Sequence, residues 1–95
     1  MRGVSGDETF RKNWRGWVRS SEGYRVRIAG RTGIDYEDEF GALRINSEAM
    51  ASRFAEIVVY TRSIPDTSER PRVEVLDRVR RALAFGGSTL SYEDA

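Results

Sequence analysis

The 95-residue chain contains no cysteine and no histidine. The missing cysteine excludes disulfide bonds, a thiolate nucleophile and metal sites built on sulfur. The missing histidine removes the most common general base, a common metal ligand and the usual pH switch. The sequence also contains no G-x-S-x-G motif and no P-loop. We therefore expect a protein that is not an enzyme and that holds no catalytic residues, no cofactor and no metal ion.

Long apolar runs are also missing. No stretch approaches the roughly 20 apolar residues that a membrane helix needs. The first residues, MRGVSGDETFRKNW, contain no apolar segment typical of a secretory signal. These absences lead us to expect a cytoplasmic protein with no membrane partner.

Charge is abundant and unevenly distributed. Sixteen basic and fifteen acidic residues give a net charge of +1, and fifteen of the basic residues are arginine. Residues 1–31 hold eight basic and three acidic groups, whereas residues 32–56 hold two basic and six acidic groups. The folded chain can therefore present one basic and one acidic surface.

The apolar pattern predicts one α+β domain over residues 13–95, preceded by a flexible tail over residues 1–12. Apolar and charged residues alternate over Tyr24–Ile28, which predicts the second strand of a hairpin over residues 14–30. For residues 46–54, the sequence is compatible with either a helical turn or a loop. Three further strands are predicted, at residues 42–45, 56–61 and 88–92.

One long helix is predicted over residues 71–85. Its proline suits the first turn, and Leu76, Val79 and Leu83 form an apolar stripe. Gly86-Gly87 supplies a residue for the left-handed conformation that often ends a helix. The predicted order is β-β-β-β-α-β, a four- to five-stranded, mostly antiparallel sheet packed on one long C-terminal helix.

The segment GIDYEDEFG at residues 33–41 gathers four carboxylates around one tyrosine. We expect a polar loop, and its spacing does not fit a calcium-binding loop. One hypothesis is a solvated loop that only aids solubility. The other is a recognition loop, whose acids steer it onto a cationic partner while the tyrosine anchors it. The candidate partner-binding residues are Asp35, Tyr36, Glu37, Asp38 and Glu39.

The arginine-rich hairpin supports an alternative, a nucleic-acid-binding module. Arginine neutralises phosphates, and aromatic side chains on a sheet stack with bases. The competing interpretation places Tyr24 in the core and leaves the arginines as a solvated face. The acidic block of residues 32–56 would also repel a nucleic acid, which makes this partner the less expected one. The candidate nucleic-acid-binding residues are Arg15, Trp17, Arg19, Arg25 and Arg27.

Three stretches carry a resemblance to a known family: INSEAM at residues 45–50, EIVVYTRSI at 56–64 and RVEVLDRVRRALAFGG at 72–87. Over residues 17–92 the chain resembles small immunity proteins of bacterial polymorphic toxin systems, and is most similar to the immunity family numbered seventy-four. The resemblance implies a cytoplasmic, non-enzymatic protein that binds and neutralises a cognate toxin. We therefore expect an immunity-type toxin inhibitor first and a nucleic-acid-binding module second. A third possibility is an assembly subunit that pairs through an exposed edge strand, and the expected state is a monomer or weak homodimer.

Overall fold

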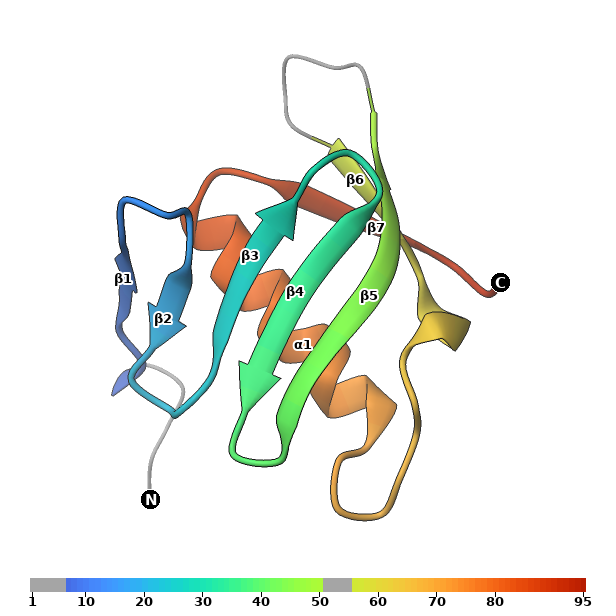
Figure 1. Ribbon diagram of the computed structural model, residues 1–95, viewed down its shortest axis with the longest axis horizontal. Helices are drawn as coiled ribbons and strands as arrows, with labels where there is room; N and C mark the ends of the chain where they lie inside the picture. The colour runs from blue at the N-terminus through green and yellow to red at the C-terminus, as the bar shows by residue number, and fades with distance from the viewer. Residues whose placement is uncertain (1–6, 51–55) are drawn as a thin grey trace.

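A computed structural model of the chain describes residues 7–50 and 56–95. In this part of the chain, seven strands form one sheet whose spatial order follows the order of the chain (Figure 1). Strands β1 to β6 are antiparallel neighbours, and β6 and β7 run parallel. The strands are β1 (Phe10–Lys12), β2 (Val18–Ser20), β3 (Arg25–Ala29), β4 (Gly33–Asp38), β5 (Gly41–Ala49), β6 (Glu56–Tyr60) and β7 (Thr89–Glu93).

A parallel pair of strands requires a crossover connection, which here contains the helix α1 (Arg72–Phe85). A short 3-10 helix, η2 (Thr61–Ser63), directly follows β6. The predicted helix at residues 71–85 is thus confirmed. It ends as expected at the paired glycines, because Gly87 adopts a φ of 92°. The N–H groups of Gly87 and Ser88 then bond to the carbonyls of Ala84 and Leu83.

The predicted number of four to five strands is wrong, because two segments assigned elsewhere are strands. Phe10–Lys12, assigned to the flexible tail, forms β1, and Gly33–Asp38, assigned to a polar loop, forms β4. The alternation in β4 was hidden because the charged Asp38 lies on the same face as the apolar Ile34 and Tyr36. The segment 46–54 begins as the end of β5, and its residues 51–54 lie outside the described residues.

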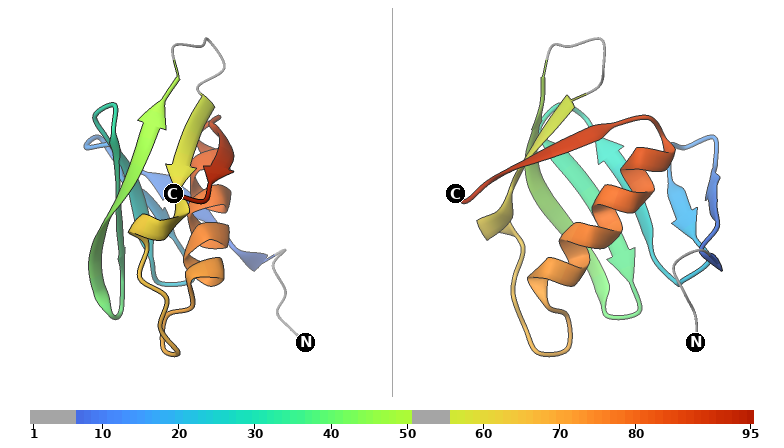
Figure 2. Two further views of the ribbon diagram at one scale, coloured as in Figure 1. Left: turned by 90° about the vertical axis from the view of Figure 1, so that its right-hand side faces the viewer. Right: turned by 180° about the vertical axis from the view of Figure 1, so that it is seen from behind.

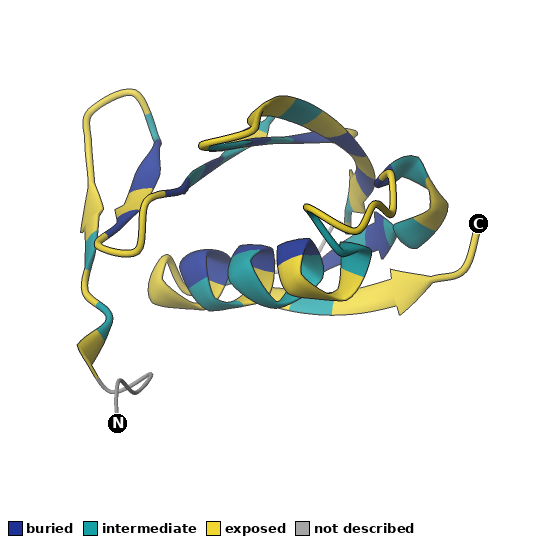
Figure 3. Ribbon diagram, turned by 90° about the horizontal axis from the view of Figure 1, so that it is seen from below, coloured by how far each residue is buried: buried dark blue, intermediate teal, exposed yellow. Residues whose placement is uncertain are grey.

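The sheet curls around α1 as an open half-barrel, with the helix on its concave face (Figure 2 and Figure 3). β5 joins the two parts of the sheet, because residues 41–46 pair with β4 and residues 47–49 pair with β6. The core lies between the concave face and the helix. Its buried residues are Val18, Tyr24, Val26, Ile34, Tyr36, Ile45, Ile57, Val59, Ile64, Val75, Val79, Ala82 and Leu83.

The curvature leaves the convex face of the sheet open to solvent. Within the described residues, no helix is both long enough and apolar enough to cross a membrane. The convex face, the turns and the sheet edges are therefore the parts of the described chain that can meet a partner.

Candidate nucleic-acid interface

Strand register places a row of arginines across the convex face of β1, β2 and β3. Arg11 lies opposite Arg19, and Arg19 lies opposite Arg25. Directly opposed residues of antiparallel strands share a face, and like charges at such positions destabilise a sheet. An anion bound over this row would remove that repulsion.

The carboxylates of β4 neutralise the part of the convex face next to this row. Glu37 pairs with Arg25 at 2.9 Å, and Asp35 pairs with both Arg27 at 2.8 Å and Arg44 at 2.6 Å. Burial raises the pKa of Asp35, but hydrogen bonds from Arg27 and Arg44 outweigh burial and hold the pKa below its usual value. Asp35 therefore remains charged and fixes the guanidinium groups of Arg27 and Arg44 on the two sides of β4.

Trp17 lies beneath two of these arginines. The guanidinium carbons of Arg25 and Arg27 lie 3.9 Å and 4.5 Å from the centre of its ring. This stacking leaves Trp17 only 8% exposed. Trp17, a predicted nucleic-acid-binding residue, is thus a support for the arginines rather than an open stacking surface.

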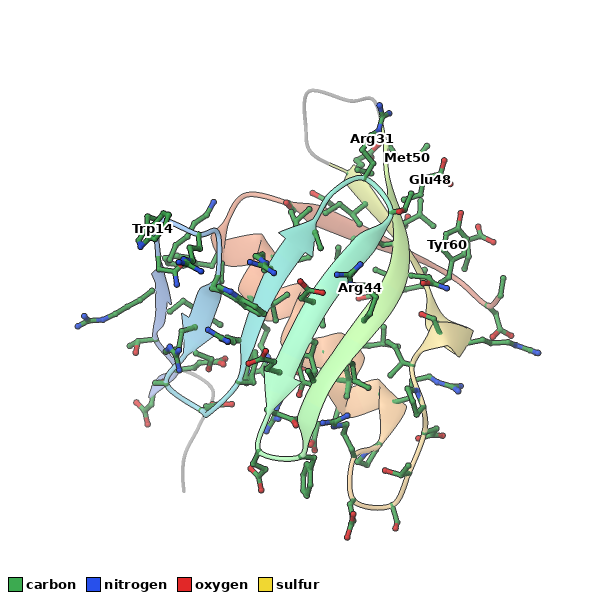
Figure 4. All side chains as sticks on the ribbon, in the orientation of Figure 1. Trp14, Arg31, Arg44, Glu48, Met50 and Tyr60 are labelled. Carbon is green, nitrogen blue, oxygen red and sulfur yellow. The ribbon has the colours of Figure 1, made fainter. Side chains whose placement is uncertain are left out.

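Trp14 is the exposed aromatic residue of the hairpin, at 85% exposure (Figure 4). The turn that carries it is ordered by Asn13, whose Oδ1 accepts hydrogen bonds from the N–H groups of Arg15 and Trp17 at 2.9 and 3.0 Å. The guanidinium of Arg15 lies 4.7 Å from the Trp14 ring centre. Trp14 was not among the predicted site residues. The available signal was its place inside the turn Asn13–Gly16, between β1 and β2.

Several cations around this turn lack an acidic partner. In residues 7–50 and 56–95, no carboxylate lies within 4.0 Å of their charged groups. The remaining residues, 1–6 and 51–55, contain no aspartate or glutamate. These exposed cations are Arg11, Lys12, Arg15 and Arg19, and Arg31 is a further one in the distant turn between β3 and β4 (Figure 4).

The acidic segment lies in β4 and its following turn rather than in a loop, and its inward side chains are buried. Tyr36 is fully buried and its ring stacks with that of Tyr24 at 6.1 Å. The Asp38 side chain is 1% exposed and accepts hydrogen bonds from Tyr36 Oη and Arg70 Nη2, both at 2.7 Å. Of the five candidate partner-binding residues, only Glu39 is exposed. The expectation that Tyr36 stands out as an anchor is therefore not met in this structure.

The buried network around Asp38 extends to the helix. Arg78 Nη1 donates to Tyr36 Oη at 3.1 Å and lies 3.7 Å from Asp38 Oδ2. Burial raises the pKa of Tyr36 to about 12, and the hydrogen bond to Asp38 adds to this rise. Burial also raises the pKa of Asp38, but hydrogen bonds from Arg70, Tyr36 and a backbone N–H outweigh it and lower that pKa.

A second buried carboxylate, Glu8, holds the base of the hairpin. Its Oε2 accepts hydrogen bonds from Ser20 Oγ at 2.5 Å and Tyr24 Oη at 2.6 Å, and its Oε1 pairs with Arg81 of α1. The Glu8 side chain is 3% exposed. Glu8 thus links the segment before β1 to the sheet and the helix, and it fixes the direction in which the hairpin projects.

Among the described residues, no three histidine, cysteine or acidic side chains are grouped so as to hold a metal ion. Comparisons with protein-family models, curated proteins and solved structures found no match to this chain. The similarity to immunity proteins therefore rests on the three quoted stretches alone and stays a prediction.

Proposed function

We propose that the protein binds single-stranded nucleic acid through a basic face, defined as Trp14 together with Arg11, Arg15, Arg19, Arg25 and Arg27. The observation that carries this proposal is the hairpin's set of exposed cations without acidic partners, beside an indole that is 85% exposed. Arginine neutralises phosphates and releases their counterions. An exposed aromatic ring offers a base a stacking surface.

The acidic residues of the segment 32–56 were expected to repel a nucleic acid, but several of them are neutralised by arginines in the fold. Asp35 and Glu37 already pair with arginines, and Asp38 is buried against Arg70. By register and these pairs, the convex face of β1 to β5 carries five arginines against three carboxylates. They are Arg11, Arg19, Arg25, Arg27 and Arg44 against Asp35, Glu37 and Glu48. A phosphate backbone crossing this face therefore meets a net positive charge.

Single strands suit this face better than a duplex. The helix α1 packs on the concave side of the sheet, away from the basic face, so it is not placed to enter a groove (Figure 3). To stack on the exposed indole, a base must have an accessible ring face, and the bases of single strands have one.

The proposal is tested by fluorescence anisotropy with a labelled 20-nucleotide single strand at 50 and 200 mM salt. We expect an affinity that falls steeply with salt, because the logarithm of the binding constant falls by about 0.7 per phosphate contact for each decade of salt. Trp14→Ala should cost about 1–3 kcal/mol of binding free energy. Phe40→Ala removes another exposed aromatic residue, in the turn after β4, and serves as the matched control. Absence of binding at 50 mM salt would refute the proposal.

A toxin-neutralising role is the second candidate, favoured by a different acidic surface. The convex side of β5, β6 and β7 carries Glu48, Glu56 and Glu93, together with the exposed Met50 and the half-buried Tyr60. Tyr60 Oη donates to Glu48 at 2.8 Å, and Figure 4 shows both residues far from Trp14. An acidic, tyrosine-bearing surface of this kind suits a cationic protein.

This second candidate is tested by affinity capture from a bacterial lysate, with the three glutamates changed to glutamine. We expect a captured polypeptide to be lost with this triple variant. It should be retained when the exposed loop residues Asp66 and Glu69 are neutralised instead. Equal capture by both variants would exclude the acidic surface of β5 to β7 as the site.

A further inference from the structure

The two edges of the sheet differ in how they are protected. β1 is three residues long and carries Arg11 and Lys12, and short charged strands are a common way of blocking edge pairing. β7 is five residues long, and its first four residues, TLSY, contain no charge, no proline and no glycine. Within the described residues, β7 pairs only with β6, so its other side presents unpaired backbone groups (Figure 2).

We propose that β7 pairs antiparallel with β7 of a second copy, around a two-fold axis at Ser91. This contact joins the two sheets edge to edge in a symmetric dimer, the most common type of homo-oligomer. It does not depend on the proposed nucleic-acid binding, because β7 and the Trp14 turn lie at opposite ends of the strand order.

The register centred on Ser91 pairs all five residues of β7 with residues of the second strand. Ser91 lies opposite Ser91 of the partner subunit, Leu90 opposite the partner's Tyr92, and Thr89 opposite the partner's Glu93. No like charges meet in this register. Moving it by two residues toward the C-terminus places Glu93 opposite the partner's Glu93, which is unfavourable.

The side chains on the concave side of β7 supply contact area for this pairing. Leu90 lies opposite the buried Ile57 and packs against the core, and Tyr92 lies on the same side and is 46% exposed. Cross-strand pairs of an aromatic and an aliphatic side chain stabilise antiparallel strands. Each copy would contribute one Tyr92 and one Leu90 to two such pairs. A contact limited to one pair of edge strands is small, so we expect a weak, concentration-dependent dimer.

Cysteine cross-linking tests the register directly, because the chain contains no cysteine of its own. Directly opposed Cα atoms lie about 4.5–5.5 Å apart in antiparallel strands, within the range of a disulfide. Under mild oxidation, Ser91→Cys should form a covalent dimer at least tenfold faster than Ser68→Cys, a control in the exposed loop before α1. Equal cross-linking rates for the two variants would overturn the proposal.

Sedimentation velocity provides a second test, through charge pairing at the two-fold axis. Wild type should shift toward dimer as its concentration rises, and Ser91→Lys and Ser91→Asp should each remain monomeric because like charges would meet. Mixing the two variants should restore a dimer. A mixture that stays monomeric would overturn the proposal. So would wild-type species that grow beyond a dimer, because they would indicate head-to-tail pairing of β7 with β1.

Discussion

The β1–β2 hairpin and strand β4 are both short, highly charged segments, but their charges have different surroundings. Asp35, Glu37 and Asp38 of β4 each contact one or more arginines, and Asp38 is almost completely buried. Arg11 and Arg19 of the hairpin are exposed and lie directly opposite each other on the neighbouring strands β1 and β2. This difference teaches that charge density alone does not mark a binding surface. Charge left without a partner in the folded chain is the better indicator.

The largest expected effect comes from breaking the buried pairs of β4. Asp38→Ala leaves Arg70 and Arg78 without their shared carboxylate, and removing one partner of a buried ion pair costs about 3–5 kcal/mol. Glu39→Ala, one residue further on and exposed, should change the free energy of unfolding by less than about 0.5 kcal/mol. Urea denaturation of both variants measures this contrast. Equal stabilities would show that the Asp38 network does not stabilise the fold.

The two tryptophans of the hairpin should separate stability from binding. Trp17→Ala removes a side chain that is 8% exposed and should cost about 3 kcal/mol of unfolding free energy. Trp14→Ala, at 85% exposure, should leave the free energy of unfolding within about 0.5 kcal/mol of wild type. Chemical denaturation of the two variants checks the prediction. A large loss of stability in Trp14→Ala would assign that residue a structural role.

The acids of β4 should also make stability depend on pH at the acidic end. The pKa values of Asp35 and Asp38 are lower in the folded chain than the ordinary value of 3.8, so the unfolded chain takes up protons first. Their contribution is therefore present above pH 3.8 and is lost as the pH falls through the folded values. Urea midpoints measured between pH 6 and pH 2 should decrease across this window, and Asp38→Asn should flatten the decrease. An unchanged slope in Asp38→Asn would show that the Asp38 carboxylate does not contribute to this pH dependence.

The smallest expected effect is a gain, rather than a loss, in the free energy of unfolding. Changing Arg11 and Arg19 to glutamine removes directly opposed like charges and should raise the free energy of unfolding by about 0.2–1 kcal/mol. Substitutions that raise stability but weaken binding are expected at positions where a charged residue serves function rather than folding. Thermal denaturation at low salt, with Arg62→Gln/Arg80→Gln as a variant of equal net charge, measures the sign. A clear loss of stability would indicate that the arginine row has structural partners.

The sequence was sufficient for the elements with regular periodicity. The stripe of Val79 and Leu83 marked α1, and the alternation of Tyr24 to Ile28 marked β3. β1 carried too short a pattern to predict. β4 was hidden because Asp38 faces inward, where a buried charge is stable only beside the arginines that the fold brings to it.

Prediction of the candidate site had the same limit. Five arginines or aromatic residues of the hairpin were identified, but their individual roles depend on pairings between strands. Trp17 is covered because the register brings Arg25 and Arg27 over it. Trp14 is exposed because Asn13 closes a turn around it. Glu8 and Arg81, which lie far apart in the chain, meet only in the fold.

The most direct test of the central claim compares two double variants in one titration with a labelled 20-nucleotide single strand. Arg11→Gln/Arg19→Gln removes cations without partners, and Asp35→Asn/Glu37→Gln releases Arg25, Arg27 and Arg44 from their ion pairs. We expect weaker binding for the first variant and tighter binding than wild type for the second. Unchanged binding in the arginine variant, or weaker binding in the carboxylate variant, would contradict the central claim.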